Sequence, residues 1–251
     1  MATYKIHEPP NVTDPEALDC LMAVERMRQV SFSLTQSVLE QLRRHPVTAA
    51  TRVALAAGWR MNEGAISAQY LSLKNHVRDA SILVLSLYEL QLDLQYIAAD
   101  LTRADTWIDH AKDNRKPWSV ATQLREICLA ARELEAQLWL YRHLSMSKHA
   151  NPVGGIASFP FAVSRNFIQY EEAEGASALL LPTLFALASC IERAAVAASR
   201  IWSTQGIEVA DVAQTLTEQL NTVSKINERK ILAYLQAARA DSDAPPGAPA
   251  G

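Results

Sequence analysis

Glycine, cysteine and aromatic residues are scarce in this chain of 251 residues. It holds 8 glycines and 3 cysteines, and aromatic residues make up 7% of the total. Alanine and leucine are abundant instead. Strands favour β-branched and aromatic residues, whereas alanine and leucine lose little on entering a helix. This composition argues against a β fold and predicts an all-α protein.

The cysteines offer neither a disulfide framework nor a zinc site. Cys20, Cys128 and Cys190 lie far apart and form no Cys-x-x-Cys pair. Structural zinc sites need such paired spacings, and a disulfide framework normally uses an even number of cysteines. An odd, scattered set is typical of reduced thiols in a cytoplasmic core. We therefore expect a cytoplasmic protein.

Sequence signatures of common cofactor sites are also missing. There is no GxxxxGK[ST] or GxGxxG phosphate loop and no GxSxG segment. All six histidines lie in the first 149 residues, and none stands three residues after a glutamate, which excludes the Glu-x-x-His pair of di-iron bundles. We expect no metal and no nucleotide cofactor.

The chain lacks both an excess of positive charge and a long apolar run. Its 24 basic and 27 acidic residues give a formal net charge of −3, so any contact with nucleic acid would be local and salt-sensitive. The most apolar window, 176–191, contains Pro182 and runs into Glu192 and Arg193. It is shorter than the ~18–20 uninterrupted residues of a membrane span, so we expect a buried helix and no membrane partner.

Helical periodicity is what the sequence does contain. Apolar residues recur at three- and four-residue steps over most of the chain, and capping residues and prolines mark the segment ends. We predict six to seven helices in a single bundle, with long antiparallel members. Their expected ranges are 13–45, 47–57, 65–100, 102–112, 119–149, 178–203 and 209–240.

The remaining segments have a different character. Residues 1–12 are expected to form an extended N-terminal arm, and 241–251, rich in proline, glycine and alanine, a disordered tail. Residues 156–174 are aromatic and β-branched, and predict an irregular connection or a short hairpin. No internal repeat or linker divides the chain, so 13–240 is expected to be one domain.

Polar residues gather at the end of the predicted helix 119–149, in the run RHLSMSKH. Steps of three, four and seven residues place Arg142, Ser145 and His149 on one helix face. That face continues an apolar stripe, so the fold must supply partners or a cleft for these side chains. Glu89, in a leucine-rich helix, is the candidate partner of Arg142. The stripe consists of Ala131, Leu134 and Leu138.

A purely structural interpretation explains the same residues without chemistry. Lys148 and His149 would stand in the last helical turn, where cations are favoured by ~0.3–1 kcal/mol. Arg142 could extend past packed methylenes to water, and Glu89 could be solvated. Four tryptophans are expected to pack in the core or at its rim. These are Trp107, Trp118, Trp139 and Trp202.

The run from Arg142 through His143 to His149 resembles the signature of the HEPN superfamily, helical-bundle proteins whose name stands for higher eukaryote and prokaryote nucleotide-binding. Six residues separate Arg142 from His149, the long end of that family's range. The region 73–151 is also similar to bacterial helical proteins labelled only as a domain of unknown function. Those pair a glutamate with a later Tyr…Ser…His run. The residues that fit are Glu89, Tyr141, Ser145 and His149.

This resemblance implies a metal-independent endoribonuclease that acts as a homodimer on RNA. His149 would move protons, Arg142 would stabilise charge on the phosphate, Glu89 would fix Arg142, and Ser145 would orient the phosphate or the imidazole. A toxin or phage-defence role and a neutralising partner protein are further expectations. Additional contacts with the strand are expected from His143, Lys148, Arg115, Lys116 and Arg165.

The alternative is a non-catalytic helical module that binds a protein or a nucleotide. In that case the residues 142–149 are a structural polar patch. The two interpretations differ in whether Arg142 is needed for RNA cleavage or for stability.

Overall fold

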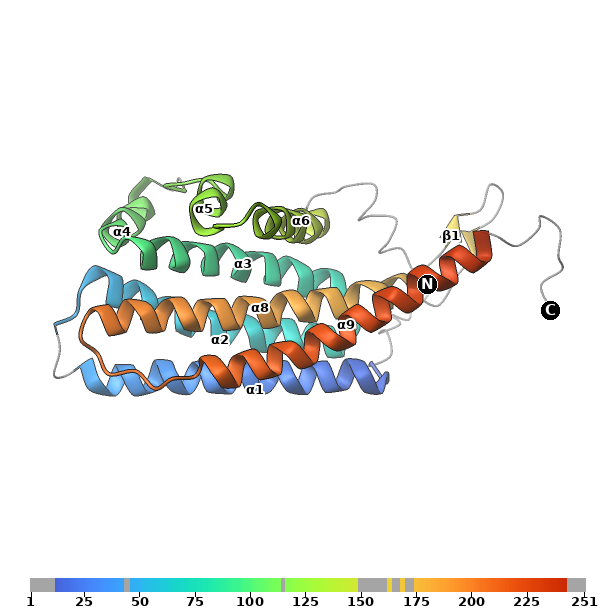
Figure 1. Cartoon of the computed structure of the whole chain (residues 1–251), viewed down its shortest axis with the longest axis horizontal. Coiled ribbons are helices and arrows are strands. Elements are labelled where there is room, and N and C mark those ends of the chain that lie inside the picture. The colour runs from blue at the N-terminus through green and yellow to red at the C-terminus, as the bar shows by residue number, and fades with distance from the viewer. Residues whose placement is uncertain are drawn as a thin grey trace, which may run out of the picture.

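A computed structural model describes residues 12–42, 46–113, 116–148, 162–163, 168–169 and 174–242. The predicted all-α class is confirmed: these residues form eight helices and one pair of two-residue strands (Figure 1). The predicted arm and tail lie outside them, apart from Val12 and the last two residues of the final helix. The helices are α1 (Pro15–Gln41), α2 (Ala49–Leu73), α3 (Val77–Ala99), α4 (Arg103–Asp113), α5 (Val120–Ile127), α6 (Ala131–Lys148), α8 (Glu174–Thr204) and α9 (Ala213–Ser242).

The strands lie in the segment predicted to be an irregular connection or a hairpin. β1 (Ala162–Val163) pairs antiparallel with β2 (Ile168–Gln169), with Ala162 opposite Gln169. This short pair agrees with the hairpin alternative.

The five long helices run up and down along one axis. α1, α3 and α8 run in one direction, and α2 and α9 run in the other (Figure 1). The hydroxyl oxygens of Ser81 in α3 and Thr183 in α8 lie 2.8 Å apart near the starts of these parallel helices. The shorter helices α4, α5 and α6 form a layer across α3, on the side away from α1. We call them the α4–α6 layer.

The core lies between α1, α2, α3 and α8, and small residues allow close approach of these helices. A Cβ atom at Gly64 would stand 2.6 Å from Cδ2 of Leu87, and one at Gly58 would stand 2.5 Å from Oγ1 of Thr35. The large residues around them are fully buried. They include Met27, Met61, Leu87, Leu94, Ile97 and Trp202.

Two predicted helix boundaries are wrong. Gly58 and Gly64 do not interrupt the second helix, because they serve as contact points inside a continuous α2. The break falls instead at Asn75, whose φ of 58° is left-handed, a conformation that asparagine tolerates. The predicted helix 119–149 is also two helices, because Cys128 takes an extended conformation after α5.

Two of the described helices are long and apolar enough to cross a membrane by length and composition alone. They are α3 (Val77–Ala99) and the stretch Leu180–Thr204 of α8. Much of the second is packed inside the bundle. This agrees with the prediction of a buried helix around 176–191.

Candidate functional site

The helix α6 packs on α3 through a face that matches the predicted stripe only in part, since Leu134 and Leu138 are half-buried against the core. Gln137, Leu140 and Leu144 are its buried residues, whereas Ala131 and Arg142 are exposed. The break at Cys128 starts α6 afresh and separates its orientation from that of α5. The predicted stripe is therefore packed in part, but Arg142 does not lie on its packed side.

Two tyrosines fix the packed face of α6. The hydroxyl of Tyr88 in α3 lies 3.0 Å from the carbonyl oxygen of Gln137 and 2.9 Å from its Oε1. The ring of Tyr141 packs against that of Tyr88, with centroids 6.1 Å apart. Burial raises the pKa of Tyr88 well above its usual range, so this hydroxyl remains a donor at neutral pH. The contact sets which residues of α6 face outward.

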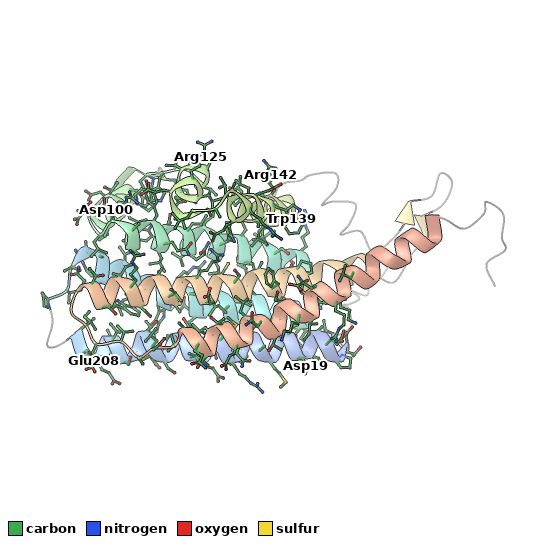
Figure 2. All side chains as sticks on the ribbon, viewed as in Figure 1. Asp19, Asp100, Arg125, Trp139, Arg142 and Glu208 are labelled. Atoms are coloured by element: carbon green, nitrogen blue, oxygen red, sulfur yellow. The ribbon has the colours of Figure 1, made fainter. Side chains whose placement is uncertain are left out.

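Arg142 extends from the outer side of α6, away from α3 (Figure 2). Among the residues that the structure describes, none forms an ion pair with it. Ser145, one turn later, is half-buried, and its Oγ donates a 2.7 Å hydrogen bond to the carbonyl oxygen of Tyr141. The guanidinium is therefore open to solvent, while the serine hydroxyl is tied to its own helix.

Glu89 has another partner than the expected Arg142. Its carboxylate accepts a 2.7 Å hydrogen bond from the ammonium of Lys116, in the connection between α4 and α5. The Glu89 side chain is 20% exposed and that of Lys116 is 48% exposed. The structure thus brings together two predicted site residues, Glu89 and Lys116, but in a pair that the sequence did not suggest.

Several predicted site residues cannot be placed. His149, Arg115 and Arg165 lie outside the described residues. His143 and Lys148 belong to α6, but their side chains are also outside the described part. The proposed meeting of Arg142 with His149 stays a prediction.

The outer face of α6 presents charge and an aromatic ring to solvent. We define the outer α6 face as Arg132, Glu135, Trp139 and Arg142, which follow one another at three- and four-residue steps and are all exposed. Trp139 is 59% exposed, so the prediction that it packs in the core or at its rim is wrong. Arg125 of α5 also points away from the bundle (Figure 2).

The other three tryptophans do pack, and two of them reveal a cluster that sequence reasoning missed. Asp93 of α3 accepts hydrogen bonds from Nε1 of Trp107 (3.0 Å), Nε1 of Trp118 (2.8 Å) and Nε2 of Gln123 (2.7 Å). Nearby, the guanidinium of Arg103 lies 3.7 Å from the ring centre of Tyr96. Three donors occupy the Asp93 carboxylate, so it serves as an anchor and not as a base.

The sequence contains only part of the information needed to predict the cluster around Asp93. An aspartate inside a leucine-rich helix needs partners, because a buried carboxylate without donors is costly. Its three donors come from three separate places, namely α4, the following connection and α5. Only the tertiary fold shows that they meet.

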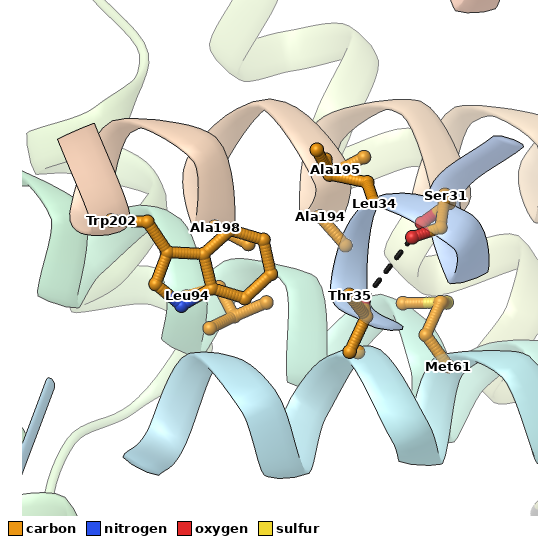
Figure 3. A pocket seen from close by; sticks show the side chains of 10 residues that line it. Ser31, Leu34, Thr35, Met61, Leu94, Ala194, Ala195, Ala198 and Trp202 are labelled. Atoms are coloured by element: carbon orange, nitrogen blue, oxygen red, sulfur yellow. Dashed lines mark hydrogen bonds between the residues drawn. The ribbon is translucent and has the colours of Figure 1, made fainter. Parts of the chain in front are cut away.

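A small cavity lies inside the described part of the bundle. This cavity between α1, α2, α3 and α8 measures about 10 Å³, enough for a single water molecule (Figure 3). The buried Nε1 of Trp202, which belongs to its lining, has no hydrogen-bond partner among the described residues. The other lining residues include Thr35, Gly58, Met61, Leu94 and Ala198. A nucleotide does not fit there.

Metal and thiol chemistry find no support in the described residues. No group of three or more His, Cys, Asp or Glu side chains gathers there in a way that could hold a metal ion. The three cysteines are buried and unpaired. Burial raises the pKa of Cys20 to about 12 and that of Cys190 above its usual range, so neither is a thiolate nucleophile at neutral pH.

Comparison of the chain with models of protein families, with curated proteins and with solved structures finds no match in any of the three.

Proposed function

We propose that this protein is a metal-independent endoribonuclease of the HEPN type that contacts RNA through the outer α6 face. The observation that carries the proposal is the position of Arg142, which is exposed, has no ion pair from the described residues and lies one turn from the exposed Trp139. A planar guanidinium suits the oxygens of a phosphate, and an indole ring can stack on a base of a single strand.

The proposed reaction needs no metal. The 2′-oxygen of the RNA attacks the adjacent phosphorus and the bond to the 5′-oxygen breaks, which leaves a 2′,3′-cyclic phosphate and a 5′-hydroxyl end. Arg142 would stabilise the negative charge that develops on the phosphate oxygens. His149 would accept the 2′-hydroxyl proton or protonate the leaving oxygen, because histidine ordinarily titrates near pH ~6.5.

The ion pair of Glu89 changes one assigned role. Since Glu89 binds Lys116, we assign it to holding that ammonium instead of fixing Arg142. The half-exposed Lys116 would then add local positive charge for the strand. With a net charge of −3, the protein should bind RNA only through such local groups, and added salt should weaken cleavage steeply.

The test incubates purified protein with mixed RNA in EDTA and looks for new 2′,3′-cyclic phosphate ends. Arg142→Ala should lower the cleavage rate by at least ~100-fold, the size expected for losing a charge-stabilising donor. Its melting temperature should stay within a few degrees of the wild type, because the side chain is exposed. Arg26→Ala, which removes an exposed arginine of α1, is the matched control and should cleave normally.

Two results would contradict the proposal. One is the absence of cyclic phosphate ends at every protein concentration tried, which also answers the objection that a dimer had not formed. The other is an Arg142→Ala protein that cleaves at the wild-type rate. A ribonuclease of this kind would act in the cytoplasm, as a growth-arresting toxin or a phage-defence effector.

A second candidate function is a non-catalytic interaction module. The observation that favours it is a row of exposed apolar side chains on α2, far from α6 in the chain.

A further inference from the structure

The outer face of α2 carries an apolar row with the spacing of a helix-pairing seam. We define the α2 seam as Trp59, Glu63, Ile66, Tyr70 and Leu73, which follow one another at steps of four, three, four and three residues. All five are exposed, and Tyr70 reaches 60%. Steps of three and four place side chains along one line of a helix, as in the contact line of two paired helices.

Most of this line lies outside the packing of the bundle. α2 packs on α1, α3, α4 and α8 through its other side, where Met61, Gly64, Ala65 and Ala68 are buried. Contiguous exposed apolar patches are uncommon on monomeric proteins and often mark interaction sites. Within the part of the chain that the structure describes, no helix therefore packs over the centre of the α2 seam.

Contacts within the chain hold the side chain of Trp59, one member of the seam, in a defined orientation. Nε1 of Trp59 donates a 3.2 Å hydrogen bond to Oε1 of Glu63, and the ring of Phe32 in α1 meets the indole edge to face, with centroids 5.2 Å apart. Trp59 nevertheless remains 47% exposed. An ordered aromatic side chain loses little conformational entropy when a partner covers it.

We propose that a second copy of this chain pairs along the α2 seam, antiparallel, about a two-fold axis at Ile66. The ends of the seam support this choice, because residues equally far from a two-fold axis face each other across it. Trp59 and Leu73 each stand seven residues from Ile66, so the axis sets Trp59 of one copy against Leu73 of the other. Ile66 packs on its own counterpart.

Charge and hydrogen bonding agree with the same arrangement. The axis sets Glu63 of one copy beside Tyr70 of the other, where the phenol can donate to the carboxylate. The ammonium of Lys74, 6.0 Å from the Tyr70 ring centre in the same chain, then lies about one turn from the opposing carboxylate. The one carboxylate of the seam thus lies near a cation of the other copy.

This pairing does not depend on the proposed ribonuclease activity. The α2 seam belongs to the bundle, whereas the outer α6 face belongs to the layer across α3. Arg142→Ala should therefore leave the association unchanged, and a monomeric variant tests the interface alone.

Sedimentation velocity of the full chain, from low to high micromolar concentration, measures the association. Wild-type protein should form a dimer, and Ile66→Glu should weaken it by at least ~100-fold, because two carboxylates would face each other on the axis. Leu232→Glu, which changes a 59% exposed leucine of α9, is the matched control and should still dimerise. Circular dichroism checks that both variants remain helical.

A cross-link tests the axis itself. Under mild oxidation Ile66→Cys should form a disulfide-linked dimer, because equivalent residues on a two-fold axis lie close enough to bridge. Leu232→Cys should not, and the native cysteines are buried. A monomeric wild type, a dimer that tolerates Ile66→Glu, or an Ile66→Cys dimer that does not cross-link would each overturn the proposal. The first result would point to another occupant of the seam.

Discussion

The bundle core and the α4–α6 layer are held together by different kinds of contact. In the core, α2 and α3 approach until a Cβ at Gly64 would collide with Leu87, and the stabilising term is apolar area spread over many residues. In the layer, Asp93 and Tyr88 of α3 anchor α4, α5 and α6 through hydrogen bonds. The layer also packs apolar residues, among them the buried Leu124, Leu140 and Leu144, so it combines a smaller apolar contact with a few directional bonds.

This difference predicts how each region responds to damage. Apolar packing distributed over four helices unfolds cooperatively, whereas a segment anchored by few polar bonds can open by itself at lower free energy. The candidate RNA contact lies on the layer. Opening of the layer should therefore change the outer α6 face before it changes the α2 seam.

Removal of the Asp93 anchor should have the largest effect on stability. Asp93→Ala leaves the indole N–H groups of Trp107 and Trp118 and the amide of Gln123 without their acceptor. Each partly buried donor left unpaired costs ~1–3 kcal/mol, so the layer should lose about 3 kcal/mol. Hydrogen exchange of residues 103–127 and the tryptophan emission in urea measure this loss.

The matched control for this change is Glu135→Ala, which removes an exposed carboxylate of the same layer. It should change the unfolding free energy by less than ~0.5 kcal/mol. If both variants exchanged their amide protons alike, the layer would not depend on Asp93. Faster exchange throughout the core would show instead that the two regions unfold together.

Overpacking of the core should have the next largest effect. Gly64→Ala places a methyl group against the fully buried Leu87, which should cost ~1–3 kcal/mol, only partly offset by the ~1 kcal/mol that alanine gains over glycine in a helix. Ser67→Ala on the exposed side of α2 also gains helix preference, though less than replacement of a glycine does, and has no such collision, so it should be neutral or slightly stabilising. Urea unfolding of both proteins gives the comparison.

A double variant sharpens this test. If the collision with Leu87 is the cause, Leu87→Val should reduce the cost of Gly64→Ala, and the two changes should be non-additive. Additive free energies would place the cause elsewhere in α2.

The helices and their beginnings followed from local signals. Asp14 and Pro15 predict the start of α1, and the Asp14 carboxylate does accept the N–H groups of Glu16 and Ala17. The break was predicted at Gly58 and Gly64 instead of Asn75, because a glycine can either end a helix or allow a neighbouring helix to approach closely. Gly64 allows the close approach of Leu87 in α3, which only the tertiary structure shows.

The candidate site was less predictable, because it depends on which way a helix turns. By spacing alone, Leu134 and Leu138 or Leu140 and Leu144 could each have been the most deeply packed pair of α6. The contact between Tyr88 and Gln137 accompanies burial of the second pair, leaves the first pair half-buried and turns Arg142 outward. Likewise the sequence suggested Arg142 as the partner of Glu89, but the path of the chain before α5 brought Lys116 to it instead.

The smallest expected effect concerns the attachment of α9, which uses charge at the surface of the core. The ammonium of Lys230 donates to Asp14 at 3.1 Å and lies 2.9 Å from Glu16. Partial burial raises the pKa of Asp14, but the hydrogen bonds from Lys230 and from two backbone N–H groups outweigh it, so the pKa lies below its usual value. The hydrogen bonds to Glu16 and Asp14 raise the pKa of Lys230.

The directions of these two pKa shifts determine the pH range over which the ion pair stabilises the fold. Because the pKa of Asp14 is lower in the folded than in the unfolded chain, its charge stabilises the fold above the unfolded pKa near ~4, and this stabilisation is lost as the pH falls through the folded pKa. Because the pKa of Lys230 is higher in the folded than in the unfolded chain, its charge stabilises the fold below the unfolded pKa near ~10.4, and this stabilisation is lost as the pH rises through the folded pKa.

Asp14→Asn keeps a helix-capping oxygen and removes only the charge, so it isolates the ion pair. It should lower stability by less than ~1 kcal/mol at neutral pH, since both side chains are largely exposed. Thermal melts of the two proteins should converge below pH ~3 and in high salt, and a constant difference across that range would mean that the charge of Asp14 does not hold α9.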